Sequence, residues 1–193
     1  MQQALVLIDL INELIAPEGR LSGKGFTEFA ERHGTLKRIA ALLDQARRQA
    51  DRIIHVRVGF SPDYREQPKG SPLFKHAAKL GAFRLGDGGT EFLPQAAPLP
   101  GETVLTKHRV NAFHGTPLDL MLRNAGIQRV AIIGCATDLA VQTSARTAHD
   151  LDYVTSVIGD CCIAPRDEDH DPTLRMLAKV ANVVTLEEYL NQD

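Results

Sequence analysis

Two charged residues and one short segment have the types and positions needed for joint chemistry. Asp9 and Lys107 each stand at the end of a short apolar run, and the segment 134–141, Gly-Cys-Ala-Thr-Asp-Leu-Ala-Val, follows another. A carboxylate and an ammonium group brought together at a partly dry position hold each other charged and can orient or transfer a proton. Asp9 and Lys107 are therefore the first candidates for acid–base chemistry.

The elements that must position these residues alternate along the whole chain. Short apolar runs rich in β-branched residues are typical of parallel strands covered on both faces. Helical spacing is clearest at 28–50, and further helices are expected at 117–125, at 138–151 and after Asp171 as N-cap, with Pro172 in the first turn. Six strands are expected, at 4–8, 53–58, 102–106, 130–134, 153–158 and 182–185. The alternation predicts an α/β fold, a three-layer α-β-α sandwich around a mostly parallel sheet of about six strands.

This fold would bring the candidate residues together. Ligands of parallel sheets bind beyond the carboxyl ends of the strands, and Asp9, Lys107 and the segment 136–140 each follow an expected strand. Taken singly, each has a structural explanation, because an Asp after a strand often stabilises a turn and most lysines are solvated. Their coincidence at one edge of the sheet favours a catalytic role for Asp9 and Lys107.

The chain length and composition narrow the class of protein. A chain of 193 residues suits a single domain spanning 1–193. The region at about 59–101, rich in Pro and Gly, interrupts the alternation, and long loops of this kind often serve as lids or interface arms. Its glycine cluster at 86–89 lacks the Gly-Lys-Ser/Thr ending of a phosphate-binding loop, which favours a simple turn.

The charge and the cysteine content indicate the class of partner and the cellular compartment to expect. A net charge of −2 and a pI of about 6.4 give no reason to expect a nucleic acid or a membrane surface as partner. The apolar runs are too short to span a bilayer, and no secretory signal is visible. Three cysteines, two of them adjacent, do not form a disulfide framework. We expect a cytoplasmic protein with reduced thiols.

Three segments resemble the isochorismatase-like hydrolase superfamily, also called the cysteine hydrolase family. The segment 7–13 is similar to the opening strand and loop of that family, with Ile11 in place of a common Gln. The segment 107–113, Lys-His-Arg-Val-Asn-Ala-Phe, is similar to the motif that carries the family's Lys. The segment 134–138 resembles the motif that carries a non-proline cis peptide bond, here between Cys135 and Ala136.

The resemblance implies roles for these residues. It makes Asp9 and Lys107 catalytic, and it implies that the backbone N–H groups of Ala136 and Ala140 point at a substrate oxygen, where such donors stabilise developing charge. It also implies a small-molecule substrate and a homo-oligomeric protein, with the excursion at 59–101 as a possible interface.

One position departs from the family pattern. Covalent members carry a Cys where this chain has Ala140, and that Cys attacks an amide carbonyl. Ala140 has no nucleophilic atom, which leaves three interpretations. The chain is a non-covalent hydrolase, like the isochorismatases that cleave a vinyl ether, or a catalytically silent binding or scaffold protein, or a Cys-to-Ala variant of a covalent amidase. Cys135 is expected to point into the core rather than to replace the missing thiol.

Four residues are candidates for substrate binding. Phe60 and Tyr64 follow the second strand and would form an apolar wall, together with Phe74 from the excursion. Phe113 and Arg109 come from the Lys-containing segment, and the Arg109 guanidinium could clamp a substrate carboxylate. An ion pair of Arg109 with Asp138 or Asp119 explains that residue equally well.

Metal chemistry is not expected. The zinc-binding nicotinamidases of the family hold their metal through an Asp-x-His motif after strand two, and the segment 58–63 contains no His here. His55 lies inside that strand and is expected to pack in the core, and the acidic run at 167–171 suits a helix start. The glycine fingerprint of dinucleotide-binding proteins is absent after the first strand. We expect no required metal and no cofactor.

Overall fold

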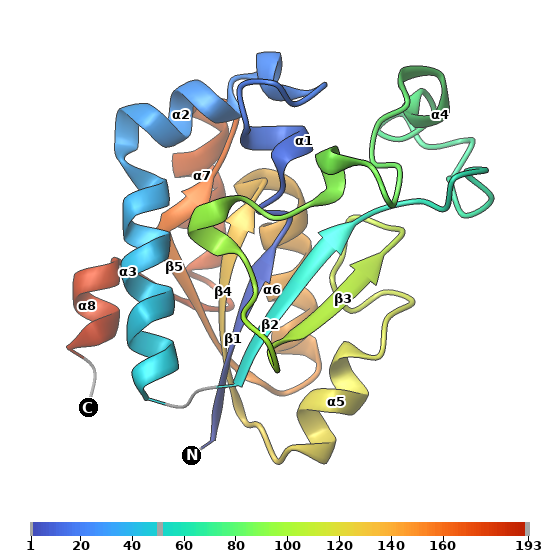
Figure 1. Cartoon of the computed structure of the whole chain (residues 1–193). Helices are drawn as coiled ribbons and strands as arrows, with labels where there is room; N and C mark the ends of the chain where they lie inside the picture. Colours follow the sequence, from blue (N-terminus) through green and yellow to red (C-terminus); the bar gives the residue numbers. More distant parts are fainter. Residues whose placement is uncertain (1, 50–51, 192–193) are drawn as a thin grey trace.

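A six-stranded, fully parallel sheet forms the centre of the protein, whose computed structural model describes residues 2–49 and 52–191 (Figure 1). The strand order is β3-β2-β1-β4-β5-β6, so the first strand lies inside the sheet between β2 and β4. The α/β fold with a parallel sheet that the sequence predicts is confirmed. The strands are β1 (Gln3–Ile8), β2 (Arg52–Val58), β3 (Thr103–Lys107), β4 (Arg129–Cys135), β5 (Val154–Ile163) and β6 (Asn182–Val184).

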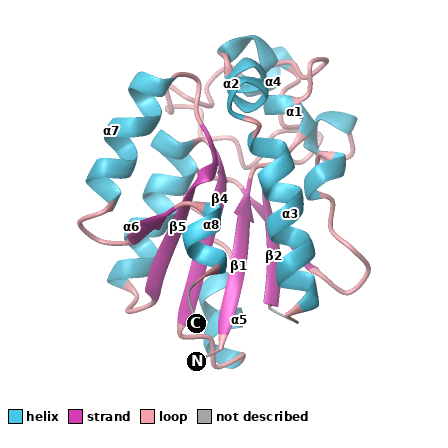
Figure 2. Ribbon diagram, turned by 90° about the vertical axis from the view of Figure 1, so that its left-hand side faces the viewer, coloured by secondary structure: helices cyan, strands magenta, loops and turns pink. Residues whose placement is uncertain are grey.

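Helices cover both faces of this sheet (Figure 2). The helices α3 and α8 lie on one face, while α5 and α6 lie on the other, with α7 packed beside α6. The α-helices are α1 (Asn12–Ile15), α2 (Phe26–His33), α3 (Thr35–Arg48), α4 (Ala77–Leu80), α5 (Leu118–Asn124), α6 (Gln142–Asp150), α7 (Asp167–Leu177) and α8 (Leu186–Leu190). Within the described ranges, no helix combines the length and the apolar character needed to cross a bilayer.

The core lies along the two central strands. Residues 4–8 of β1 and 130–135 of β4 are buried without exception, as expected for strands that are covered on both faces. Their side chains belong to one apolar cluster that also includes Ile39 and Leu42 of α3 and Ala145 of α6. Burial of this continuous cluster holds the strand ends, and therefore the candidate residues, in fixed positions.

Two predicted helices differ from the observed ones. The helix expected at 28–50 is divided into α2 and α3 at Gly34, whose φ of 62° ends α2 in a left-handed cap; position 50 lies outside the described residues. The helix expected to start with Asp171 as N-cap begins instead at Asp167. Acidic residues in the first turn favour this earlier start, and Pro172 lies inside the helix.

The fifth strand is longer than predicted. It extends to Ile163, and the register of its pairing with β4 shifts between Ile132 and Gly134. Cys161 and Cys162 therefore lie within the strand rather than after it, and both are buried. Burial raises the pKa of both thiols, that of Cys162 to about 12, which suits packing residues rather than reactive ones.

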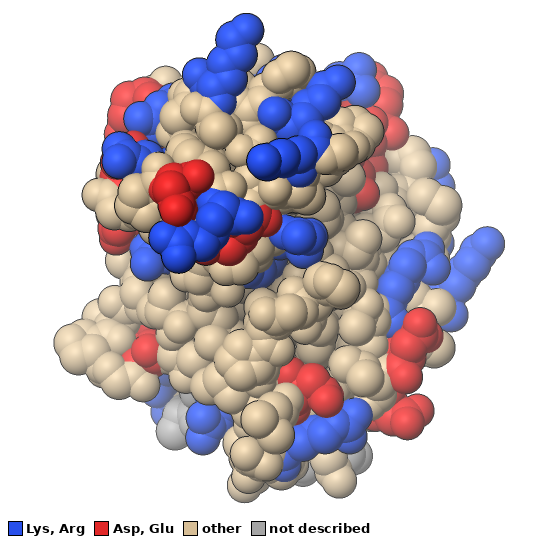
Figure 3. Space-filling view, turned by 90° about the vertical axis from the view of Figure 1, so that its right-hand side faces the viewer, with Lys and Arg blue, Asp and Glu red and all other residues tan. Residues whose placement is uncertain are grey.

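The excursion at 59–101 is an ordered arm built around its own apolar cluster. Phe60, Phe74 and Phe83 pack edge to face, with ring centroids 5.5 to 6.5 Å apart. The buried carboxylate of Glu13 joins the arm to α1, because it accepts a hydrogen bond from the backbone N–H of Phe83 (2.9 Å) and pairs with Arg20 (3.2 Å). On the side of the molecule that carries the arm and the β3 edge, charged side chains of both signs gather in the upper part, and the middle is largely uncharged (Figure 3).

Candidate active site

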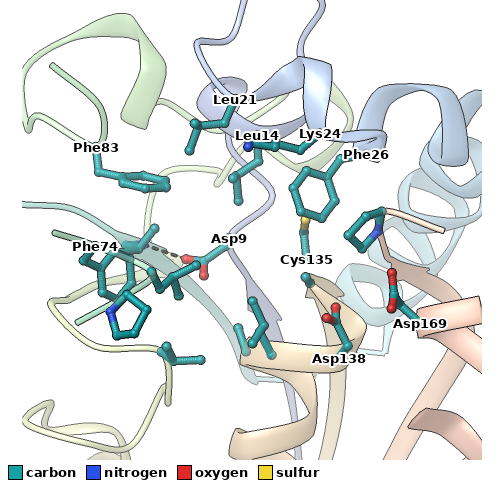
Figure 4. Close-up of a pocket in the computed structure, with 18 of the residues that line it drawn as sticks. Asp9, Leu14, Leu21, Lys24, Phe26, Phe74, Phe83, Cys135, Asp138 and Asp169 are labelled. Atoms are coloured by element: carbon teal, nitrogen blue, oxygen red, sulfur yellow. Dashed lines mark hydrogen bonds between the residues drawn. The ribbon is translucent and has the colours of Figure 1, made fainter. Parts of the chain in front are cut away.

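A cavity of about 790 Å³ lies where the carboxyl ends of β1 to β4 meet the arm and the segment between α1 and α2. The residues that end these strands or follow them directly, Asp9, Val58, Lys107 and Cys135, form its floor. Its walls are mostly apolar. Figure 4 shows Phe74 and Phe83 of the arm on one side of the cavity and Leu14, Leu21 and Phe26 above it.

Asp9 and Lys107 form an ion pair on this floor. The Lys107 Nζ lies 2.7 Å from Asp9 Oδ2, and the two side chains are only 1% and 5% exposed. The pair spans the end of the intervening strand β2, since Asp9 Oδ1 accepts a hydrogen bond from the Val58 N–H (2.6 Å). Lys107 also donates to the carbonyl oxygen of Arg109 (3.1 Å). The structure therefore brings the two predicted residues into direct contact.

The electrostatics of the pair follow from its burial. Burial raises the pKa of Asp9 above its usual value, and the Lys107 ammonium and the Val58 N–H oppose this effect only in part. Asp9 also adopts a left-handed backbone with a φ of 53°. Such conformations are uncommon outside glycine and cluster at functional sites.

The turn after β4 brings Ala136 and Ala140 to the same cavity. A Cβ atom at Gly134 would lie 2.0 Å from the carbonyl oxygen of Ile8, so only glycine fits against β1 at this position. The φ of Gly134 is 138°, a backbone conformation that residues with a side chain rarely adopt. The Cys135–Ala136 peptide bond that follows is cis. The Val141 N–H then bonds to the Ala136 carbonyl (3.1 Å), which closes one π-helical turn and places Ala140 at the cavity surface.

Cys135 lies in a different environment from the one expected. Its thiol is buried, as predicted, but it lines the cavity below Phe26 rather than facing away from it (Figure 4). Burial raises the pKa of this thiol well above its usual value, and the nearby carboxylates of Asp9 and Asp138 add to the effect. Because the thiolate is the nucleophilic form, this environment makes Cys135 a poor replacement for the missing cysteine.

The four residues expected to bind substrate lie outside the cavity lining, and this prediction needs correction. Phe60 is fully buried behind Phe74 and Phe83 and supports the wall from the rear. Tyr64 is turned into the arm, where its hydroxyl donates to the Ala82 carbonyl (3.0 Å). Phe74, by contrast, lines the cavity as expected.

Arg109 and Phe113 leave the site because the chain turns away at the end of β3. Arg109 is exposed, and its Nη1 donates to the carbonyl oxygens of Glu66 (2.9 Å) and His108 (2.6 Å) rather than to either proposed Asp partner. Phe113 stacks on Tyr153 at a centroid distance of 6.3 Å, on the side of α5. Proximity to Lys107 in the sequence thus did not predict proximity to the cavity.

The residues that the sequence offers as metal ligands have structural roles. His55 is buried within β2, where it bonds to Glu102 (2.9 Å), and so packs as the sequence predicts. Residues 167–169 of the acidic run occupy the first turn of α7. Across the described part of the chain, no three or more His, Cys, Asp and Glu residues are grouped to hold a metal ion.

Comparisons with known proteins agree with the fold. The isochorismatase domain family model matches residues 3–188. The uncharacterized isochorismatase family protein YwoC of Bacillus subtilis is 31% identical over 190 residues, which cover 98% of this chain and 93% of that protein. The ureidoacrylate amidohydrolase RutB of Cronobacter sakazakii is 30% identical over 171 residues, 82% of this chain and 73% of that protein. A solved isochorismatase family structure from Desulfovibrio vulgaris superposes with a TM-score of 0.86 at 27% identity and covers 99% of both chains.

Proposed function

Because the chain belongs to the isochorismatase family, we propose that it hydrolyses a small molecule without forming a covalent enzyme intermediate. The observation that carries this proposal is the buried ion pair of Asp9 and Lys107 at the floor of the cavity, beside an Ala140 that has no nucleophilic atom. The family relative RutB is named for amidohydrolysis, which makes an amide or ureide one class of substrate, and a vinyl ether is the other.

Asp9 is the acid–base residue in this mechanism. For an amide, Asp9 takes a proton from the attacking water while the hydroxide adds to the carbonyl carbon, and the same proton then passes to the leaving nitrogen as the C–N bond breaks. For a vinyl ether, a protonated Asp9 adds its proton to the terminal carbon, and water adds to the resulting cation and returns a proton to Asp9. The hemiketal formed in this way then collapses to a ketone, and its C–O bond breaks to release the alcohol. The raised pKa of Asp9 favours both roles, because it makes the carboxylate a stronger base and lets the acid hold its proton closer to working pH.

The other site residues stabilise charge. The Lys107 ammonium group lies 2.7 Å from the Asp9 carboxylate. Its positive charge stabilises the negative charge of Asp9 whenever Asp9 has given up its proton. The backbone N–H groups of Ala136 and Ala140 are the donors for the oxygen that becomes negative during amide hydrolysis. Lys24 and Arg166 also line the cavity and would accommodate an anionic substrate.

A turnover screen tests the proposal. The purified chain is incubated with isochorismate and with a panel of small amides and ureides, while pyruvate and ammonia are followed together. Asp9→Asn serves as the blank for contaminating hydrolases. Asp9-dependent pyruvate release identifies a vinyl-ether hydrolase, and Asp9-dependent ammonia release identifies an amidohydrolase that uses water directly.

Two results would contradict the proposal. Turnover that Asp9→Asn leaves unchanged excludes Asp9 as the acid–base residue. No turnover on any substrate, also after Ala140→Cys restores the family's thiol, would instead favour a binding or scaffold protein, and saturable ligand binding without product would support that class.

A further inference from the structure

A buried hydrogen bond supports the turn after β4 on the side that does not face the cavity. Residues 136–140 all line the cavity except Thr137, whose side chain is fully buried. The Thr137 hydroxyl and Nδ1 of His170 on α7 form a hydrogen bond of 2.9 Å. Among residues 2–49 and 52–191, this is the one hydrogen bond that a side chain of the turn makes to another element.

The environment of His170 is suited to fixing the position of Thr137. The His170 side chain is buried, and its ring packs against Phe29 of α2 with a centroid distance of 5.0 Å. Burial lowers the pKa of His170, and the Asp171 carboxylate opposes this effect only in part. The ring is therefore neutral at neutral pH, with one donor nitrogen and one acceptor nitrogen, and a hydroxyl group can bond to either of them.

The start of α7 also forms part of the cavity wall. Arg166 and Asp169 line the cavity and bond to each other at 2.9 Å. The bond between His170 and Thr137 therefore joins a wall segment of the cavity to the turn beside it. Stability alone does not require a polar pair at this place, because two apolar side chains of the same shape can stabilise a fold as well. A hydrogen bond has a preferred distance and direction, so it restricts the turn more than an apolar contact would.

We propose that His170 is a positioning residue, which acts through Thr137 to keep the backbone N–H groups of Ala136 and Ala140 in place at the cavity. The effect on catalysis rests on the proposed function, in which these N–H groups stabilise a negative oxygen, whereas the effect on the turn requires no turnover. Displacement of a catalytic group by about 1 Å is costly, so loss of the bond should lower kcat roughly ten- to hundredfold and leave KM within about threefold.

Four variants separate the hydrogen bond from the packing around it. Thr137→Val and His170→Ala remove the bond, whereas Thr137→Ser keeps the hydroxyl group and His170→Asn keeps a polar group near the position of Nδ1. NMR order parameters of the backbone N–H groups of residues 136–140 are measured for each variant. They should be about 0.85 in the unmodified chain and in the two conservative variants, and should fall toward about 0.6 in the other two.

Turnover of any substrate found in the screen gives a second measurement. The value of kcat should fall in Thr137→Val and in His170→Ala, and it should be restored in the two conservative variants. The double variant Thr137→Val, His170→Ala should be no slower than the slower single variant, because both changes remove the same interaction.

Thr155→Val is the matched control. It removes another buried hydroxyl group, which donates to the Tyr153 carbonyl oxygen (3.0 Å) at the start of β5, the end of the sheet opposite the cavity. The order of residues 136–140 and kcat should both stay unchanged in this variant. Thermal unfolding shows which variants are folded at the temperature of the measurements.

Several results would overturn the inference. These are low order parameters for residues 136–140 in the unmodified chain, unchanged order in folded His170→Ala or Thr137→Val, no recovery in either conservative variant, and an equal loss in Thr155→Val. A loss of order that leaves kcat unchanged would overturn it as well. A loss of order that the conservative variants reverse, in a protein that turns over no substrate, would support the inference and count against the proposed function alone.

Discussion

Removing the positive partner of Asp9 should destabilise the protein more than removing both partners together. At an N–O distance of 2.7 Å and an effective dielectric constant near 20, the attraction between Lys107 and Asp9 is about 6 kcal/mol, most of which offsets the cost of burying the two charges. Lys107→Met leaves a buried, uncompensated carboxylate, and it should lower the free energy of unfolding by about 3–5 kcal/mol at pH 7. The double variant Asp9→Asn, Lys107→Met removes both charges, and its stability should lie within about 2 kcal/mol of the unmodified chain.

The dependence on pH gives this prediction a second test. The pKa of Asp9 is raised in the folded state, so its protonation favours folding below the unfolded value of 3.8, and this contribution disappears as pH rises through the folded pKa. Lys107→Met removes the charge that opposes this shift, so its destabilisation should be larger at pH 7 than at pH 5. Urea unfolding followed by circular dichroism measures both effects. A loss below about 1 kcal/mol for Lys107→Met, or a double variant as unstable as the sum of the single ones, would refute the reasoning.

Three further predictions follow from other parts of the structure. Gly134→Ala should prevent stable folding, because the added Cβ would lie 2.0 Å from the Ile8 carbonyl oxygen. Gly88→Ala is the control and should change the melting temperature little, because no atom lies within 4 Å of a Cβ at that position. Expression and thermal unfolding of the two variants are compared. Burial raises the pKa of Glu102, but hydrogen bonds from Arg47, the Leu99 N–H and His55 outweigh this and hold it at about 2. The resulting stabilisation is present above the unfolded pKa of 4.5 and is lost as pH falls toward 2, so Glu102→Gln should flatten the decline of stability between pH 5 and 3 in urea titrations. We also expect a homo-oligomer, because the face along the β3 edge has few charges at its middle; a monomeric mass by light scattering at micromolar concentration would contradict this.

The central pair could be predicted because it depends on two short-range signals and one rule of topology. Asp9 and Lys107 each end a recognisable apolar run, and parallel strands place their carboxyl ends at one edge, so neither residue required knowledge of a loop path. The family resemblance added the turn with Ala136 and Ala140, which the structure places at the same cavity.

The cavity walls were harder to predict because they come from segments without regular periodicity. Phe83 and Leu21 reach the cavity through the arm and the segment before α2, whose arrangement depends on tertiary contacts such as the bond from the Phe83 N–H to the buried carboxylate of Glu13. Phe60 lies two residues after the end of β2, yet its side chain packs behind Phe74 and does not line the cavity.

The most direct test of thiol-free hydrolysis by Asp9 compares product release by Asp9→Asn and by Cys135→Ala on one substrate found in the screen. Cys135 is the cysteine nearest the proposed chemistry, since it lines the same cavity as Asp9. The mechanism predicts that Asp9→Asn lowers kcat by a factor of about 100 or more, while Cys135→Ala stays within about threefold of the unmodified chain. The opposite pattern, with activity lost in folded Cys135→Ala and kept in Asp9→Asn, would contradict it.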